Sequence, residues 1–203
     1  MGSGVVRIGM ALLLSVASCA VLAQDVASPS PPAQRVVGEG VTGTLLRHAQ
    51  FASRHVAARN VDVWLPPGYD EAKDARYPVL YMHDGQNVFD PSTSYTRVDW
   101  GVDEAMTRLI GNGHVRPAII VAVWNTPRRL QEYMPRKAIQ GESFIPTPGD
   151  PPFPTAEIVA DAYLAFLATE LKPFIDAQYR TLTGPSDTWS MGPGMGGGVS
   201  SYG

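Results

Sequence analysis

The stretch DTWSMGPGMGGG, from Asp187 to Gly198, decides the fold of this 203-residue chain. Its first part, Thr188–Met191, predicts a short strand, and a helix is expected to begin at Met195 after a glycine-rich turn. A strand that turns sharply into a helix, with the pattern G-x-S-x-G at the turn, is the layout of a nucleophile elbow. The residues from Gly192 to Gly196, called the elbow below, fill this pattern, but Gly194 stands where the serine is expected.

Two simpler interpretations of the same stretch stay open. Glycines relieve backbone strain at sharp turns, so an ordinary glycine-rich connection has a similar sequence. A phosphate cradle is the other interpretation, but the P-loop pattern needs a lysine after its last glycine and none follows here.

Upstream of this stretch, expected strands alternate with expected helices. The alternation of Val61, Val63 and Leu65 with other residues indicates a half-buried strand, antiparallel to the strand before it. In chain order we expect strands within 41–53 and 55–65, a buried strand at 78–82, a helix at 102–110, a buried strand at 117–124, and a helix at 156–179 capped by Thr155 and kinked at Pro173. This order predicts the α/β class, with a mainly parallel sheet, N-terminal antiparallel strands and flanking helices.

The second informative stretch is the HDGQN sequence that follows the buried strand at 78–82. Loops after the C-terminal ends of strands are where α/β sheets bind ligands. We therefore consider His83, Asp84, Gly85 and Asn87 candidate ligand-binding residues. A polar turn that ends the strand is the alternative explanation.

Four motifs in matching order resemble one esterase family of α/β-hydrolases, which includes enterochelin esterase-like, feruloyl esterase-like and esterase D-like enzymes. They are LYMHDGQNVFD (Leu80–Asp90), VAVWNTPRRLQEYMPR (Val121–Arg136), LKPFIDAQYRT (Leu171–Thr181) and the MGxxMGG stretch (Met191–Gly197). The resemblance covers about residues 41 to 203 and is specific for the family but not for a substrate. It implies an α/β-hydrolase fold.

The resemblance also implies roles for individual residues. Gly194 falls on the nucleophile position, and the backbone N–H of Met195 is expected to be one oxyanion donor. The second donor is expected to be the backbone N–H of Gln86. Arg128 and Arg129 lie in a loop that lines the pocket mouth in the family, although a solvated basic loop explains them equally well.

The departures from the family pattern concern catalysis. The family's acid and histidine follow the nucleophile in sequence, whereas the four histidines here, at positions 48, 55, 83 and 114, all precede Gly194. We therefore expect a domain that is truncated and incomplete at its C-terminus. Ser190 is expected to be buried in its strand, and Ser200 and Ser201 to lie in the helix away from the elbow.

The N-terminus has the pattern of an export signal. Arg7 precedes an apolar run from Ile8 to Ala17, and a cleavage site follows at Ala23. The run is too short to span a membrane. The stretch before Cys19 also resembles a bacterial lipobox, which would make Cys19 a lipid anchor. We expect a signal peptide at 1–23, a flexible linker at 24–37 and the esterase-like domain at 38–203, with a secreted or periplasmic location.

Composition narrows the classes of partner. A formal net charge of −3 does not favour nucleic acid, so we expect none as a partner. We expect no cofactor and no metal, because Asp84, Asp90, Asp99 and Asp103 have no recognisable ligand spacing. The expected ligand is a small-molecule ester.

Three functional hypotheses follow. The first is a secreted protein of a carboxylic-ester hydrolase family that is inactive as written, since its triad is incomplete. The second is a pseudoenzyme that binds an ester, a sugar, a siderophore-like ligand or a partner protein without turnover. An active enzyme with a different nucleophile is a third and weaker hypothesis, because no cysteine or well-placed serine is evident.

Overall fold

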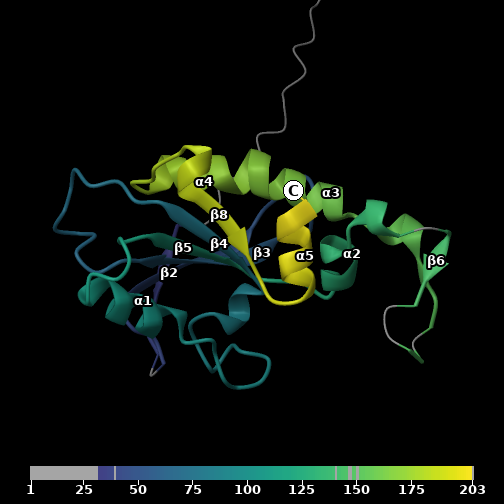
Figure 1. Cartoon of the computed structure of the whole chain (residues 1–203), viewed down its shortest axis with the longest axis horizontal. Coiled ribbons are helices and arrows are strands. Elements are labelled where there is room, and N and C mark those ends of the chain that lie inside the picture. The colour runs from purple at the N-terminus through teal and green to yellow at the C-terminus, as the bar shows by residue number, and fades with distance from the viewer. Residues whose placement is uncertain (1–31, 39, 140, 146–147, 150, 203) are drawn as a thin grey trace, which may run out of the picture.

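The computed structural model describes residues 32–38, 40–139, 141–145, 148–149 and 151–202, and their centre is a six-stranded sheet (Figure 1). The strand order across the sheet is β1-β2-β3-β5-β4-β8. The bounds are β1 Gln34–Val36, β2 Thr44–Phe51, β3 Arg59–Leu65, β4 Val79–His83, β5 Ile119–Val123 and β8 Thr188–Met191. The expected α/β class is confirmed, and the elbow stretch lies at one edge of this sheet.

The sheet is mixed. The expected N-terminal antiparallel pair is β2 with β3, and β3 continues antiparallel onto β5. Strands β5, β4 and β8 are parallel to one another. The C-terminal ends of these three strands therefore lie on the same side of the sheet, which brings the loop after β4 next to the turn after β8.

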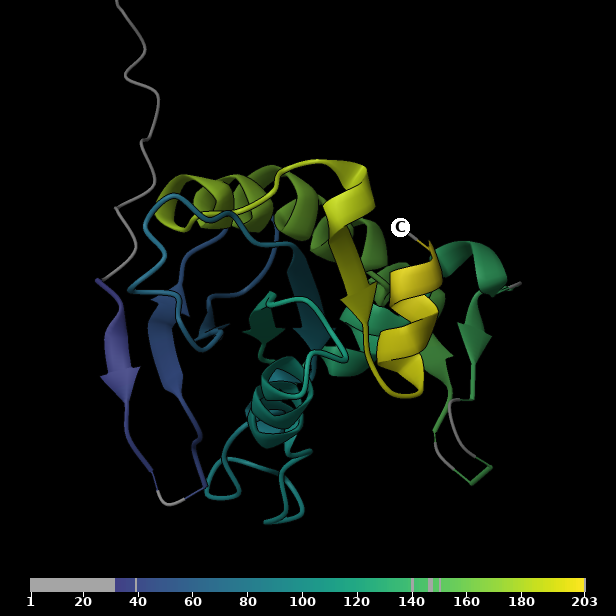
Figure 2. The same cartoon turned by 60° about the vertical axis from the view of Figure 1, so that its left-hand side comes forward.

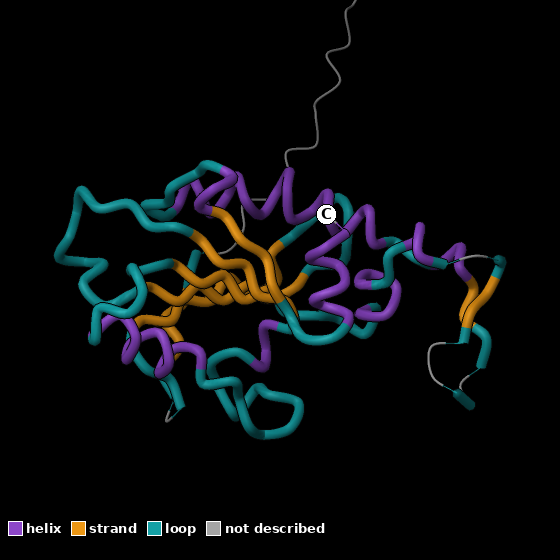
Figure 3. The backbone as a smooth tube through the Cα atoms, in the orientation of Figure 1, coloured by secondary structure: helices purple, strands orange, loops and turns teal. Residues whose placement is uncertain are grey.

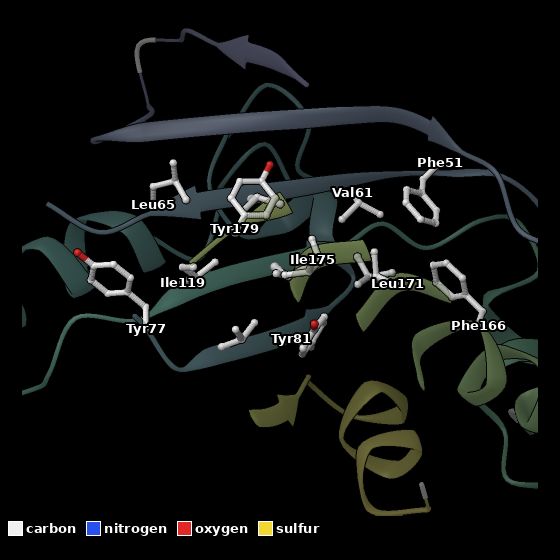
Figure 4. Close-up of a cluster of buried hydrophobic side chains, with 14 of the residues drawn as sticks. Phe51, Val61, Leu65, Tyr77, Tyr81, Ile119, Phe166, Leu171, Ile175 and Tyr179 are labelled. Atoms are coloured by element: carbon white, nitrogen blue, oxygen red, sulfur yellow. The ribbon is translucent and has the colours of Figure 1, made fainter. Parts of the chain in front are cut away.

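Helices cover both faces of the sheet (Figure 3). One face carries α1 (Val102–Gly111), which packs on a cluster that includes Trp64, Met82 and Ile120. The other face carries the larger core, whose labelled members are drawn in Figure 4. The elements there are α2 (Arg129–Tyr133), α3 (Ala160–Phe166), the π-helical turn Leu167–Leu171, α4 (Lys172–Gln178) and α5 (Met195–Tyr202).

The expectation of a half-buried strand at 55–65 is wrong. Val61 and Val63 belong to the larger core, while Trp64 is fully buried in the cluster beneath α1. Asp62 is buried on that second face as well, where its carboxylate accepts a bidentate pair of bonds from Arg47 at 2.7 and 2.8 Å. The polar residue in the alternation is therefore a buried carboxylate paired with a partly exposed arginine, and does not mark a solvent-exposed face.

The helix expected at 156–179 is divided. Thr155 begins a short 3₁₀ turn, Thr155–Glu157, and does not cap a helix, because its hydroxyl donates to the Gly141 carbonyl. The helix α3 begins at Ala160, and a π-helical turn separates it from α4. Pro173 lacks an N–H and lies in the first turn of α4; the chain is already helical before it, and the irregularity in this helical stretch is the π-helical turn just before Pro173.

The remaining elements are short. They are the 3₁₀ turns Gly85–Asn87, Arg136–Ala138 and Pro185–Asp187, and a hairpin of β6 (Ser143–Phe144) with β7 (Phe153–Pro154). Strand β1 pairs with β2 inside the segment expected to be a linker at 24–37, so that segment is ordered at residues 34–36. The expected signal peptide and Cys19 lie outside the described residues. Among the helices that the structure describes, none combines the length and apolarity needed to cross a membrane.

Candidate functional site

The stretch after β8 has the geometry of an elbow (Figure 2). The chain leaves β8 at Met191, reverses direction, and enters α5 at Met195. Gly194 lies at the turn with φ of +51°, in the left-handed region that side-chain-bearing residues rarely adopt. A Cβ built on Gly194 meets no atom within 4 Å, so the space that a nucleophile side chain needs is open.

The glycines next to Gly194 are required by close packing. A Cβ on Gly192 would approach Cβ of His83 to 3.0 Å, and a Cβ on Gly197 would approach the Gly192 carbonyl oxygen to 2.9 Å. The turn therefore lies directly against α5 and against the end of β4. These contacts explain why the sequence keeps glycine on both sides of the nucleophile position.

The HDGQN stretch forms the loop after β4 and is also constrained. Asp84 has φ of +59°, and the 3₁₀ turn Gly85–Asn87 follows it. A Cβ on Gly85 would lie 2.5 Å from the carbonyl carbon of Ala122, which is in the backbone of β5. Gly85 is thus needed to let the loop cross β5 at close range.

The Asp84 carboxylate is the anchor of this loop. It accepts bonds from Nε and Nη2 of Arg129 at 2.6 and 2.8 Å, and from Nδ2 of Asn125 at 2.6 Å. The hydrogen bond to Asp84 raises the pKa of Arg129 above its ordinary value. The backbone N–H of Asp84 donates to the Tyr133 hydroxyl at 3.3 Å. The loop is therefore fastened to α2 and to the end of β5.

A cavity of about 470 Å³, called the elbow cavity below, opens between this loop and the elbow. Its walls combine exposed aromatic rings with polar side chains. The lining residues are Asp84, Gln86, Asn87, Tyr95, Thr96, Trp100, Asn125, Thr126, Arg129 and Pro193. Gln86 and Pro193 face the same space, so both segments expected to supply oxyanion donors border this cavity.

The two expected donors differ from their neighbours in bonding. The N–H groups of Asn87 and Val88 donate to Asp84 and Gly85, while those of Gly196 and Gly198 donate to Pro193 and Gly194. Among the turn and cap bonds of the described residues, none uses the N–H of Gln86 or of Met195. Both groups therefore meet one requirement of an oxyanion donor, which is an N–H that none of these bonds already uses.

The structure brings some expected site residues together and not others. Gln86, Asn87, Asp84 and Arg129 line the elbow cavity, and Met195 contacts Arg129 through its sulfur at 3.7 Å. Gly85 is buried within this loop and does not line the cavity. Arg128 is exposed and does not line the cavity.

His83 is fully buried and faces away from the elbow cavity. Its Nδ1 is 2.7 Å from the Tyr163 hydroxyl, and its Nε2 is 3.0 Å from the Ser190 hydroxyl. Burial lowers the pKa of His83 to about 4, opposed by Asp84 and reinforced by Arg129, so the ring is neutral at pH 7. Both nitrogens are engaged, which leaves neither for a group at position 194.

Ser190 was expected to be buried, and this expectation is wrong. Ser190 is exposed, because β8 is an edge strand of the described sheet. Its hydroxyl lies between His83 and the Ser200 hydroxyl, which is 3.1 Å away. Ser190 pairs with Tyr81 of β4, and the sequence of the strand could not show that β8 lies at the edge of the described sheet.

The sequence reasoning missed several residues of the elbow cavity. Asn125 follows the C-terminal end of β5 and was discoverable by the rule that identified the HDGQN loop. Tyr95 and Trp100 lie in an irregular segment after that loop and had no pattern that could have revealed them.

One group of carboxylates has ligand atoms close enough for a cation. These atoms, one each from Asp99, Asp103 and Glu104, lie within 4.8 Å of one another. Burial raises the pKa of Asp103 to about 7, and the Thr42 N–H donates to its Oδ2 at 2.6 Å. Since an acidic cluster alone does not identify a metal site, we assign it no ligand.

Comparison with known proteins places the chain in context. Residues 54–202 match the family described as "Putative esterase". A comparison with curated protein sequences finds no match.

Solved structures similar to this chain include a siderophore hydrolase and esterases. The siderophore hydrolase EstA from Aspergillus nidulans has 19% identity and a TM-score of 0.56, with 79% of this chain and 52% of that chain covered. The enterobactin esterase FES from Shigella flexneri, in the presence of enterobactin, has 16% identity and a TM-score of 0.53, with 86% and 34% covered. The ferulic acid esterase AmCE1/Fae1A from Anaeromyces mucronatus, in complex with ferulic acid, has 25% identity and a TM-score of 0.49, with 80% and 53% covered.

These comparisons confirm the expected α/β-hydrolase fold. The chain spans about half the length, or less, of the solved structures that it matches.

Proposed function

Because the chain belongs to this esterase family, we propose that its elbow cavity binds a carboxylic ester without hydrolysing it at position 194. One observation carries the proposal. Gly194 holds the backbone conformation of the nucleophile position, with open space where a side chain would lie, yet it has no nucleophile.

The binding half of the proposal rests on backbone groups. Oxyanion stabilisation in acyl transfer uses N–H donors of the residue after the nucleophile and of a neighbouring loop. Met195 and Gln86 occupy these two places, and backbone donors do not depend on the side chain at position 194. An ester carbonyl is the group that such a pair of donors fits.

A second observation, in addition to Gly194, supports the proposed lack of hydrolysis. Within the described residues, no histidine lines the elbow cavity. His48 is buried against Tyr179, and the Nε2 of His55 is 3.3 Å from the Thr169 hydroxyl. A serine placed at position 194 would therefore meet no base to take its proton.

The walls of the cavity favour an ester with an aromatic acyl group. Tyr95 and Trp100 expose 90% and 39% of their surface at the mouth, where they can stack on a ring. Arg129 and Asn87 supply polar groups for ring substituents. The solved relatives named as a siderophore hydrolase and an enterobactin esterase make a siderophore-like ester a second ligand to test.

Binding is tested with methyl ferulate and the purified chain, by ligand-observed NMR and calorimetry. We expect a dissociation constant below about 1 mM, weakened at least ~10-fold by Trp100→Ala, because the substitution removes a stacking ring. Val98→Ala is the matched control, since Val98 is exposed in the same segment but does not line the cavity. Equal binding by the two variants, or none by the natural chain, would contradict the proposal.

The proposed lack of ester hydrolysis is tested by the substitution Gly194→Ser. We expect no ferulate release and no acyl group on the introduced serine, since no base faces it. Intact-mass and peptide analysis after incubation with methyl ferulate would detect either product. Stoichiometric acylation of the introduced serine would show that Gly194 is the only defect at the elbow.

We also propose that the protein is exported. The support is the N-terminal sequence, with Arg7, the apolar run to Ala17 and a cleavage site at Ala23. Mass spectrometry of the protein from the cell envelope and medium should find an N-terminus at Gln24. A lipid-modified Cys19 would establish the anchor instead, and retention of Met1 would refute export.

A further inference from the structure

We propose that the elbow cavity binds an aromatic carboxylate more tightly than the ester of the same acid, and that Arg129 is the residue that selects the negative charge. This inference deepens the ester-binding function proposed above and rests on it for the place of the aromatic acyl group. The walls concerned come from two neighbouring loops, because every lining residue except Pro193 lies in the segments that follow β4 and β5.

Of the residues that line the cavity, one is a cation and one is an anion, and the cation is the accessible one. The Asp84 side chain is 4% exposed, whereas the Arg129 side chain is 34% exposed. The Asp84 carboxylate accepts two bonds from Arg129 and one from Nδ2 of Asn125, so both of its oxygens are already in use. A ligand in the cavity therefore meets the guanidinium and not the carboxylate.

The guanidinium of Arg129 is held in place while one of its ends lacks a strong acceptor. Its Nε and Nη2 donate to Asp84, and its Cζ lies 5.1 Å from the ring centroid of the buried Tyr133. Among the described residues, Nη1 contacts one acceptor, the sulfur of Met195 at 3.7 Å, and a thioether is a weak acceptor. A carboxylate oxygen can replace that sulfur and form a charge-assisted hydrogen bond with a group that is already positioned.

The other unpaired polar groups of the cavity walls are mainly donors. Gln86 accepts the Asn125 N–H through Oε1 at 3.2 Å, which leaves both N–H bonds of its Nε2 without a partner among the described residues. Within the same residues, Nε1 of Trp100 has no partner either, and Oδ1 of Asn125 and the Tyr95 hydroxyl are the unpaired side-chain oxygens of the walls. An excess of donors suits a carboxylate, which only accepts hydrogen bonds.

An acid and its ester offer different groups to these donors. The carboxylate has two oxygens that share a negative charge, whereas the ester has a neutral carbonyl oxygen as its main acceptor. Hydrogen bonds with one charged partner are about twice as strong as neutral ones, so we expect the acid to bind ~10-fold more tightly. Gly194 supplies no side chain that could react with either ligand, so the two equilibria can be compared directly.

The experiment compares ferulate with methyl ferulate on the full chain at pH 7, by calorimetry and ligand-observed NMR. The two ligands share the same ring and differ at the carboxyl group alone. The ratio of the dissociation constants, methyl ferulate over ferulate, should be ~10 at low salt. This ratio should fall as the salt concentration rises from ~20 mM to ~500 mM, because salt screens a partly exposed cation.

The role of Arg129 is tested with a neighbouring arginine as the matched control. Arg129→Gln removes the cation and leaves Asp84, so the ratio should fall to ~1 or below. Arg128→Gln removes the same charge one residue away, from a side chain that is exposed and does not line the cavity. It should keep the ratio within ~2-fold of that of the natural chain.

A second variant should change the ratio in the opposite direction. Asp84→Asn removes the anion beside the guanidinium and leaves the cation, so the ratio should rise ~3-fold or more. Because both ligands are measured on the same variant, a general loosening of the loop cancels in this ratio. Circular dichroism checks that each variant folds, and Asp84→Asn carries the test if Arg129→Gln does not fold.

The outcomes separate this inference from the proposed function. If methyl ferulate binds and ferulate binds no more tightly, the inference is overturned and ester binding stands. If ferulate binds and methyl ferulate does not, ester binding fails and the preference for the acid holds. If neither ligand binds, both fail. Equal effects of Arg128→Gln and Arg129→Gln, or an unchanged ratio in Asp84→Asn, would overturn the assignment to Arg129.

Discussion

Breaking the buried ion pair between Arg59 and Glu132 should destabilise the protein strongly. The guanidinium donates to both carboxylate oxygens, at 2.7 and 2.9 Å, and each side chain is 1% exposed. Arg59 also lies 5.3 Å from the ring centroids of Tyr163 and Phe166. The pair thus connects β3 to α2, the helix that holds the loop after β4.

The magnitude follows from two opposing terms. Two charges about 4 Å apart attract by about 4 kcal/mol at an effective dielectric constant of about 20. Burial of each ion costs several kcal/mol, so the intact pair is close to balanced against an apolar pair of equal size. Removal of one partner leaves the other charge buried without its attraction. We therefore expect Glu132→Leu and Arg59→Met each to lower the free energy of unfolding by about 3–5 kcal/mol.

The assay is urea unfolding at pH 7, followed by circular dichroism, for both single variants and the double variant. The double variant should cost no more than either single one, which gives a coupling free energy of at least about 3 kcal/mol. The control is Asp187→Asn, because its partner Arg116 is also 2.7 Å away but 56% exposed; this change should cost less than about 1 kcal/mol. Additive single changes, or equal costs at the buried and exposed pairs, would refute the reasoning.

Three further changes test the site. Gly85→Ala places a Cβ 2.5 Å from the Ala122 carbonyl carbon, so it should lower the free energy of unfolding by about 3 kcal/mol in the same assay. Asp84→Asn retains a residue that tolerates positive φ but removes the charge beside Arg129, and should cost about 2 kcal/mol and weaken methyl ferulate binding in calorimetry. His83 has its pKa lowered to about 4, so the stability it confers is complete above about pH 6.5 and falls by about 3 kcal/mol as the pH drops to 4; unfolding at both pH values should show this loss in the natural chain but not in His83→Asn.

Local pattern was sufficient to predict the order of elements and the elbow. The apolar runs at 78–82 and 117–124 predicted two buried strands, and these are β4 and β5. The glycines in and after the elbow have a partly local cause, since Gly192 packs against Gly196 as well as His83, and Gly197 packs against Gly192. Features that depend on neighbours in the chain were therefore accessible from the sequence.

Features that depend on distant partners were not accessible. Asp62 looked like an exposed residue of an alternating strand because its partner, Arg47, lies on another strand. Ser190 looked buried because periodicity gives the face of a strand but not whether that strand is at an edge. His83 looked like a ligand-binding residue because its place after β4 is visible in the sequence, while the direction of its side chain is not.

Two adjacent residues after β4 face in different directions but share one support. His83 and Asp84 are adjacent, yet the first faces Ser190 and the second faces the elbow cavity. Tyr133 on α2 contacts both, since its ring centroid is 5.4 Å from that of His83 and its hydroxyl accepts the Asp84 N–H. A change in α2 should therefore disturb the packing of His83 and methyl ferulate binding together.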